Sequence, residues 1–108
     1  MSSIPENLMA QQICDAGLPK PEREFVAIKG RRYRWDFAWI KHNLLLEIQG
    51  GVFIKGAHST GLGIERDCEK MCLAAINGWQ TMSFTTRQVK SGWAIEMLKA
   101  FFESVSSE

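Results

Sequence analysis

Two carboxylates stand inside otherwise apolar segments of the chain. Asp36 lies between two aromatic residues, and Glu47 lies between a leucine and an isoleucine. An ionised carboxylate is unfavourable in an apolar environment unless it is paired or bound to a metal. A hard divalent cation with oxygen ligands, Mg²⁺, is the simplest group that would neutralise both. In the hydrolysis of a phosphodiester, such an ion would polarise a phosphoryl oxygen and help to generate the attacking hydroxide.

Both carboxylates fall in segments whose pattern predicts paired β-strands. Aromatic residues recur at period two in 33–40, which is typical of a strand that packs one face. The segment 44–49 is apolar up to Glu47, as expected for a central strand covered on both faces. If Lys41 and His42 are the two loop residues of a hairpin, the register of the two strands follows. Each residue of 33–40 then faces the residue of the other strand whose number brings the sum to 83.

This register would bring four polar side chains together. Asp36 then faces Glu47, Arg34 faces Gln49, and all four share one face of the sheet. Facing Cβ atoms lie roughly 4.5 to 5.5 Å apart, a distance at which two carboxylates repel unless a cation lies between them. A slip of one residue would instead send the carboxylates to different faces. Lys-His is not a favoured turn dipeptide, so the register is a hypothesis.

Glycine and proline divide the rest of the chain into further elements. Gly17 and two prolines end a first helix, and Asn77-Gly78 ends a second one. The segment 50–63 is too rich in glycine for regular structure and is a natural place for a site. The expected elements, in the order αβββαβα, are a helix over 4–13, strands over 24–28, 33–40 and 44–49, a helix over 64–76, a strand over 80–85 and a helix over 93–101.

Helical periodicity predicts which side chains face the core. Apolar residues of the second helix recur at spacings of three and four; they are Ile64, Cys68, Met71, Cys72, Ala75 and Ile76. Lys70 lies nearly opposite this stripe. The last helix has a similar stripe at Trp93, Met97, Ala100 and Phe101. The three cysteines are interpreted as reduced core thiols, because their number is odd and they lack metal-knuckle spacing. The four tryptophans are also expected in the core.

Length and composition predict a single small domain and argue against a membrane protein. The chain has 108 residues, 45% of them hydrophobic, with 13 basic against 12 acidic side chains. A chain this short supports one modest core, so residues 1–108 are expected to form a single domain. No apolar run approaches the roughly 18 to 20 residues that cross a bilayer, and the first ten residues lack the layout of a signal peptide. We therefore expect a cytoplasmic protein rather than a membrane protein.

A cluster of basic residues precedes the first carboxylate, and another lysine follows the second. The five are Lys29, Arg31, Arg32, Arg34 and Lys55. They would neutralise nucleic-acid phosphates and give salt-dependent affinity without sequence preference. The alternative is a solvated hairpin end. For the two carboxylates, the alternative to a metal site is a structural ion pair between Asp36 or Glu47 and these arginines.

The order of these residues resembles a nuclease superfamily. Asp36, ten intervening residues and Glu47-Ile48-Gln49, set in an αβββαβ order, resemble the PD-(D/E)XK nucleases, in the lineage of very-short-patch repair endonucleases and small phage nucleases. The resemblance covers roughly residues 21 to 92. It implies a restriction-endonuclease-like α/β fold with a mixed central sheet flanked by helices and a C-terminal helix. It also implies DNA as substrate, a bacterial or phage-infected host cell, and Mg²⁺ or Mn²⁺ held by Asp36, Glu47 and the backbone carbonyl of Ile48.

The chain departs from this superfamily at one informative position. Members usually carry lysine two residues after the glutamate, whereas this chain has Gln49, which can orient a water or a phosphate but carries no charge. Lys70 is the candidate for a migrated basic residue, but its phase, nearly opposite the apolar stripe of the helix, favours a solvated surface lysine. Glu24 would be a third acid or an exposed strand carboxylate. His58 would act as a general base or hold the scissile phosphate.

Three functions are compatible with the sequence. The leading hypothesis is a Mg²⁺-dependent endonuclease that hydrolyses phosphodiester bonds in DNA and is directed by substrate structure rather than by a long sequence. The alternative, motivated by Gln49, is a catalytically inactive nucleic-acid-binding or assembly module with the nuclease fold. A small regulatory protein with structural acid-arginine pairs would bind neither metal nor DNA. A nuclease domain this small commonly needs a second copy to cut both strands, so a homodimer is a further expectation.

Overall fold

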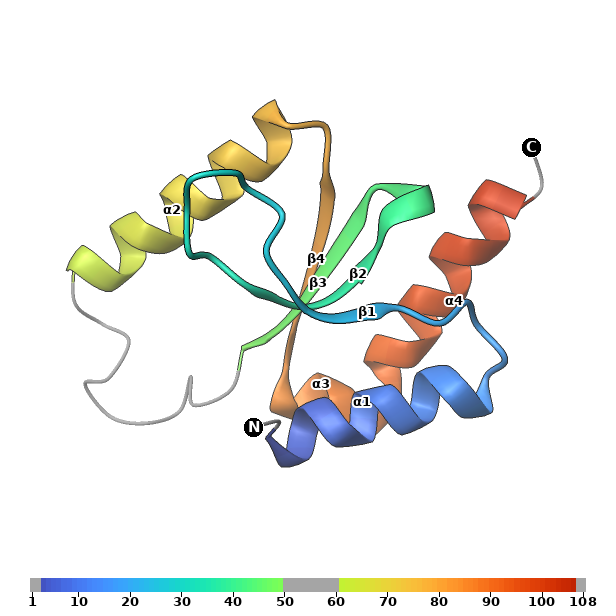
Figure 1. Cartoon of the computed structure of the whole chain (residues 1–108). Helices are drawn as coiled ribbons and strands as arrows, with labels where there is room; N and C mark the ends of the chain where they lie inside the picture. Colours follow the sequence, from blue (N-terminus) through green and yellow to red (C-terminus); the bar gives the residue numbers. More distant parts are fainter. Residues whose placement is uncertain (1–2, 50–60, 107–108) are drawn as a thin grey trace.

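The computed structural model describes residues 3–49 and 61–106, and a four-stranded sheet lies at its centre (Figure 1). In sheet order the strands are β1 (Glu22–Phe25), β2 (Trp35–Trp39), β3 (Leu44–Gln49) and β4 (Gln80–Thr85). The first three are antiparallel neighbours, and β4 runs parallel to β3. The mixed α/β architecture expected from the sequence is therefore confirmed.

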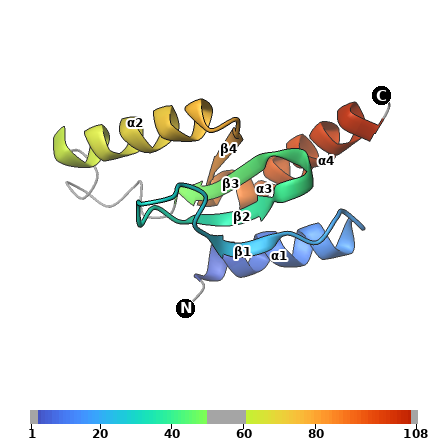
Figure 2. The ribbon, with the colours of Figure 1, turned by 45° about the horizontal axis from the view of Figure 1, so that its top comes forward.

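Helices cover both faces of this sheet. The described helices are α1 (Ile4–Asp15), α2 (Gly61–Ile76), α3 (Thr86–Ser91) and α4 (Trp93–Ser106). Helix α2 connects the parallel strands β3 and β4 and lies on one face, whereas α1, α3 and α4 lie on the other (Figure 2). Within the described part of the chain, no helix is long and apolar enough to cross a membrane.

Strand β3 is the centre of the core. Its residues Leu44, Leu45 and Leu46 are fully buried. Leu44 and Leu46 belong to the larger apolar cluster, which α1, α3 and α4 complete. Leu45 belongs to the smaller cluster, to which α2 contributes Ala74. Since successive side chains of a strand point to opposite faces, β3 is covered on both, as its apolar run predicts.

The hairpin of β2 and β3 has the predicted register but a different turn. Facing residue numbers sum to 83, as in the pair of Phe37 and Leu46. The loop is a 3-10 turn over Ile40–His42 followed by Asn43, whose φ is 51°. Asparagine tolerates this left-handed conformation better than most residues. A four-residue loop centred on the same point keeps the same sum, so the register is right although the two-residue turn is wrong.

Helix α2 packs with the face opposite to the predicted one. Ala74 is fully buried and Lys70 is 8% exposed, whereas the predicted apolar stripe lies at the surface with Ile64, Met71 and Ile76 exposed. All three cysteines are exposed free thiols, so their prediction as core residues is wrong. The prediction rests on the spacing of apolar residues alone. It takes no account of Glu47, the strand carboxylate beneath the helix, which requires a cation such as Lys70.

The element boundaries also differ in places. Strand β1 begins two residues earlier than predicted, although Ile28 beyond its end is still buried. Helix α3 is not predicted, and its start is marked by a capping box of Thr85 and Gln88. Helix α4 turns Leu98 inward and leaves Trp93 exposed, so the predicted stripe is rotated. The other tryptophans are buried or half-buried.

The core assignment predicts a contrast between two apolar truncations. Leu46→Ala empties part of the centre of β3 and should lower the free energy of unfolding by about 2 to 5 kcal/mol. Ile4→Ala, at an exposed position of α1, should change it by less than about 0.5 kcal/mol. Urea denaturation followed by tryptophan fluorescence measures both. Equal losses in the two variants would contradict the assignment.

Candidate active site

Asp36 is held where strands β2 and β3 separate. The ladder between them ends at the pair of Phe37 and Leu46, and Asp36 comes one residue beyond it. Its Oδ2 accepts a hydrogen bond from the backbone N–H of Ile48 at 2.7 Å. The side chain thus receives a donor that a neighbouring strand would otherwise satisfy. This contact fixes Asp36 in the fork beside Ile48, where the charge of Glu47 acts on its carboxyl.

Burial raises the pKa of the Asp36 carboxyl from 3.8 to about 6. Desolvation is the largest cause, and the negative charges of Glu6 and Glu47 raise the pKa further. The hydrogen bond from Ile48 and the charge of Lys70 act in the opposite direction. Asp36 therefore lies within electrostatic reach of two other acids, and an added cation would be attracted to this position.

Glu47 is the centre of a polar network on β3. Its Oε1 accepts a hydrogen bond from Nζ of Lys70, and its Oε2 accepts one from Nε2 of Gln49 at 3.2 Å. The Gln49 amide also donates to Oγ of Ser83 on β4 at 3.1 Å. Both carboxylate oxygens of Glu47 are thus oriented. The side chain keeps 26% of its surface exposed, so a substrate or an ion can reach it.

Lys70 reaches Glu47 from helix α2. Its Nζ also donates to the backbone oxygen of Arg34 at 2.8 Å and lies 4.5 Å from the centre of the Trp35 ring. A carboxylate, a carbonyl and an aromatic face all stabilise an ammonium group. Lys70 is therefore an anchored cation, and its interpretation as a solvated surface lysine is wrong.

Two of the three arginines of the basic cluster pair with acids outside the strand pair. Arg31 lies 3.1 Å from Glu69, and Arg34 lies 3.8 Å from Glu24. In the described part of the chain neither Asp36 nor Glu47 forms an ion pair with an arginine. The ion pairs that were the alternative to a metal site are therefore not found among the described residues.

The structure does not gather the predicted third acid with the other two. Glu24 is exposed, has a φ of 48° and pairs with Arg34. Among residues 3–49 and 61–106, no three His, Cys, Asp or Glu side chains form a metal-binding group. His58 and Lys55 lie outside the described residues.

Glu6 is a neighbour of Asp36 that the sequence pattern does not reveal. It lies in the first turn of α1, where its backbone N–H donates to Oγ of the N-cap Ser3. The sequence pattern of Ser3 and Glu6 is a helix start signal. That pattern indicates capping alone, and only the packing of α1 against the sheet reveals that Glu6 raises the pKa of Asp36.

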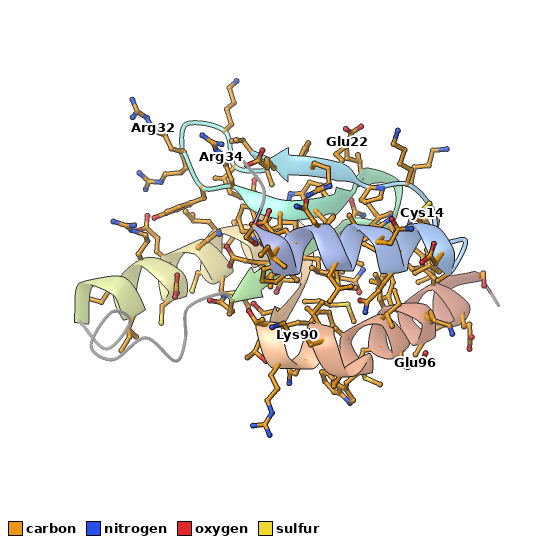
Figure 3. The ribbon with its side chains drawn as sticks, turned by 90° about the horizontal axis from the view of Figure 1, so that it is seen from below. Cys14, Glu22, Arg32, Arg34, Lys90 and Glu96 are labelled. Atoms are coloured by element: carbon orange, nitrogen blue, oxygen red, sulfur yellow. The ribbon has the colours of Figure 1, made fainter. Side chains whose placement is uncertain are left out.

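The basic residues of the β1–β2 connection lie at one end of the molecule. Arg32 and Arg34 project there, on the side away from Lys90 of α3 (Figure 3). Lys29, Arg31, Arg32 and Arg34 are all exposed. Since the Arg34 carbonyl anchors Lys70, this basic surface is directly connected to the carboxylate site.

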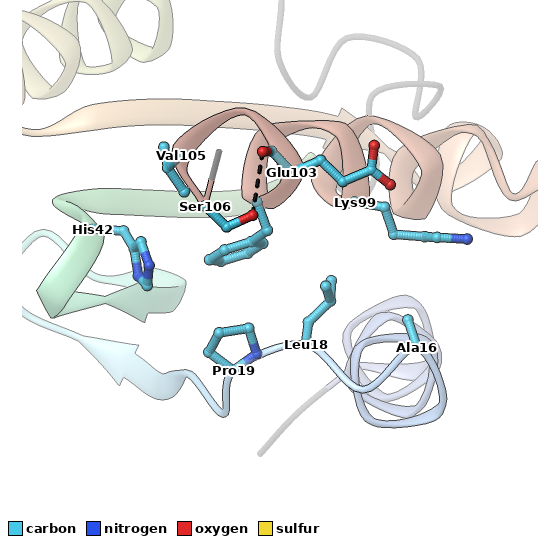
Figure 4. A pocket seen from close by; sticks show the side chains of 9 residues that line it. Ala16, Leu18, Pro19, His42, Lys99, Glu103, Val105 and Ser106 are labelled. Atoms are coloured by element: carbon cyan, nitrogen blue, oxygen red, sulfur yellow. Dashed lines mark hydrogen bonds between the residues drawn. The ribbon is translucent and has the colours of Figure 1, made fainter. Parts of the chain in front are cut away.

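A cavity of about 380 Å³ lies apart from these residues. It is formed between the end of α1, the hairpin loop and α4 (Figure 4), and its lining includes Leu18, His42 and Phe102. The His42 ring packs edge-on against Phe102, with centroids 5.0 Å apart. His42 thus lies away from the strand carboxylates.

The fold is similar to that of a known nuclease domain. The catalytic domain of the homing endonuclease I-Bth0305I superposes with a TM-score of 0.72, covering 95% of this chain and 97% of that domain at 12% sequence identity. No family model and no curated protein matches the chain. At this identity the similarity shows a shared nuclease-like fold.

The raised pKa of Asp36 predicts a pH-dependent cost in stability. Between about pH 4 and pH 6 the folded state binds more protons than the unfolded state, so the free energy of unfolding falls as pH rises. Asp36→Asn removes this titration and keeps an oxygen to accept the Ile48 N–H. A rise in pKa from 3.8 to about 6 corresponds to at most about 3 kcal/mol, which solvent screening of this half-buried group reduces. The variant should therefore be more stable than the parent by on the order of 2 kcal/mol near pH 7.5 and nearly equal near pH 4.

Urea denaturation at the two pH values measures this difference. Glu103→Gln, which removes an exposed acid from α4, is the matched control and should follow the parent at both. A constant difference between Asp36→Asn and the parent across this range would contradict the assignment.

Proposed function

We propose that this protein is a metal-dependent endonuclease that hydrolyses phosphodiester bonds in DNA. The main support is the contact between Lys70 of helix α2 and Glu47, which lies close enough to Asp36 for both charges to act on its carboxyl. The two acids and the basic residue implied by the PD-(D/E)XK resemblance are then present, with the cation supplied from a different element. The nuclease-like fold supports the proposal independently.

The residues of the fork fit a magnesium ion. Mg²⁺ is usually held by one or two carboxylates together with waters and substrate phosphate oxygens, so a third acid is not required. Asp36 and Glu47 would be the carboxylate ligands. The N–H and C=O of a strand residue project to the same edge, so the carbonyl of Ile48 also faces the fork and would add a ligand. Burial is the main cause of the raised pKa of Asp36, and the charges of Glu6 and Glu47 add to it; a bound cation would offset that negative charge.

The bound ion would supply Lewis-acid polarisation of the phosphate and activation of a water. The protein side chains orient the reactants around it. Lys70 places a positive charge beside Glu47, where it would stabilise the charge that develops on the phosphoryl oxygens. Gln49 is fixed by Ser83 and Glu47 and would orient a water or a phosphate through its amide. His58 stays a candidate for positioning the phosphate.

The position of Lys70 bears on the alternative function. A binding module that had lost hydrolysis was suggested by the missing charge at Gln49. Lys70 provides that charge at the same carboxylate, so an uncharged residue at 49 is no longer a reason to expect inactivity. Binding of DNA without cleavage under any metal condition would restore this alternative.

The exposed basic residues would contact the DNA backbone. Lys29 and Arg32 carry exposed charges, whereas Arg31 and Arg34 would exchange their ion pairs for phosphate contacts. Phosphate contacts confer affinity without reading the sequence. We therefore expect preference for a DNA structure, such as a branch, flap, nick or mismatch, over a long base sequence.

Cleavage should depend on the three clustered side chains. Glu47→Gln, Asp36→Asn and Lys70→Met should each lower the rate of Mg²⁺-dependent cleavage by about 100-fold or more, because each removes a metal ligand or the adjacent cation. End-labelled linear, nicked, flapped, mismatched and four-way-junction DNA are incubated with Mg²⁺, Mn²⁺ or EDTA, beside a labelled RNA that tests the sugar preference.

Lys41→Met, at an exposed position of the hairpin loop, is the matched control for Lys70→Met and should retain full cleavage. Circular dichroism establishes that each variant is folded. A folded Glu47→Gln or Asp36→Asn protein that cleaves at the parental rate would refute the proposal.

DNA affinity should depend on salt through the basic end of the molecule. Arg32→Ala should weaken binding and reduce the slope of log K against log salt by about 0.9, which corresponds to one lost contact with a duplex phosphate. Lys90→Ala, on α3, should leave both quantities unchanged. Fluorescence anisotropy in EDTA separates binding from cleavage. Equal effects of the two substitutions would contradict this placement of the DNA.

A further inference from the structure

Helix α2 exposes an apolar stripe on the face opposite to Lys70. Ile64, Met71 and Ile76 are three of the large hydrophobic residues that the described structure leaves exposed, and Cys68 and Cys72 lie between them. A shallow hollow lined by Ile64, Asp67, Cys68, Met71 and Cys72 follows the same face. Exposed apolar residues that gather on one helix face mark an interaction surface more often than residues scattered singly do.

The spacing of this stripe is self-complementary. Ile64, Cys68, Cys72 and Ile76 follow one another at intervals of four, which forms a ridge along the helix. The ridge is symmetric about position 70. In an antiparallel pair of such helices, residues whose numbers sum to 140 face each other. Ile64 then meets the second copy's Ile76, and Cys68 meets its Cys72, so the same patch serves both copies as a two-fold interface requires.

Charge selects the antiparallel arrangement. Glu65 and Asp67 flank the stripe in the first half of the helix, and with Arg66 and Glu69 they leave that half net acidic, whereas residues 71–80 contain no charged side chain. A parallel pair would bring the acidic halves together, and like charges there would repel. An antiparallel pair sets each acidic half against the neutral half of the other copy.

We propose that the exposed face of α2 is the interface of an antiparallel homodimer. Lys70 points to the opposite side of the same helix, so pairing through this face leaves both carboxylate sites uncovered. A pair of 16-residue helices is small compared with a standard protein interface, so the dimer exchanges with monomer. This inference concerns assembly and does not rest on the proposed cleavage.

Sedimentation equilibrium across a range of concentrations tests the interface. The weight-average mass should rise toward twice that of one chain at protein concentrations on the order of 100 µM. Ile64→Lys should raise the dissociation constant of the dimer by about tenfold or more. Ile40→Lys is the matched control, because Ile40 is 52% exposed and Ile64 is 53% exposed, and it should leave the equilibrium unchanged. A monomer throughout, or a dimer that Ile64→Lys leaves intact, would overturn the proposal.

Crosslinking of single-cysteine chains tests the orientation. One chain keeps Cys68 (Cys14→Ser, Cys72→Ser) and the other keeps Cys72 (Cys14→Ser, Cys68→Ser). A short bis-maleimide should crosslink the mixture efficiently and each chain alone poorly, and Ile64→Lys in both chains should abolish the product. Crosslinking within each unmixed chain but not between the two would indicate a parallel pair and overturn the antiparallel model.

Discussion

The contact between Glu47 and Lys70 constrains most of the structure. Glu47 occupies a central strand between buried residues, and a carboxylate there without a counter-charge would be strongly destabilising. The cation comes from α2, so the helix must rotate until Lys70 faces the sheet. That rotation brings small Ala74 into the core and turns a well-formed apolar stripe to the surface. Because desolvation of the two charges offsets much of their attraction, we expect the pair to contribute little net stability and to favour this orientation of the helix.

Asp36 shows a second compromise between folding and chemistry. The strand ladder ends beside it, and its carboxylate replaces a backbone partner for Ile48. A carboxylate that desolvation and neighbouring acids push toward protonation is a poor choice for stability alone. The same environment favours the arrival of a cation. Under the proposed function, the fork would be a preorganised place for positive charge, built on the sheet.

The sequence predicts the sheet better than the helix that crosses it. The aromatic alternation before Asp36 and the apolar run of β3 depend on burial alone, so the strands and their register could be derived. The buried face of α2 could not be derived from the sequence. Helical periodicity depends only on apolar residues such as Ile64 and Met71, and it takes no account of an acid on a strand far away in sequence. Glu6 was missed for the same reason. Local pattern assigns it to helix capping, and its proximity to Asp36 exists only in the folded chain.

A cation delivered by a helix changes how relatives of this chain can be found. When the acid and the basic residue share a strand, their separation is fixed at two residues, and a short text pattern detects both. Here Lys70 follows Glu47 by 23 positions, so under the proposed function no short fixed spacing connects the acid with the cation. Fixed-spacing searches will pass over such chains. Searches that compare the mutual placement of two acids and an amine in three dimensions will recover them.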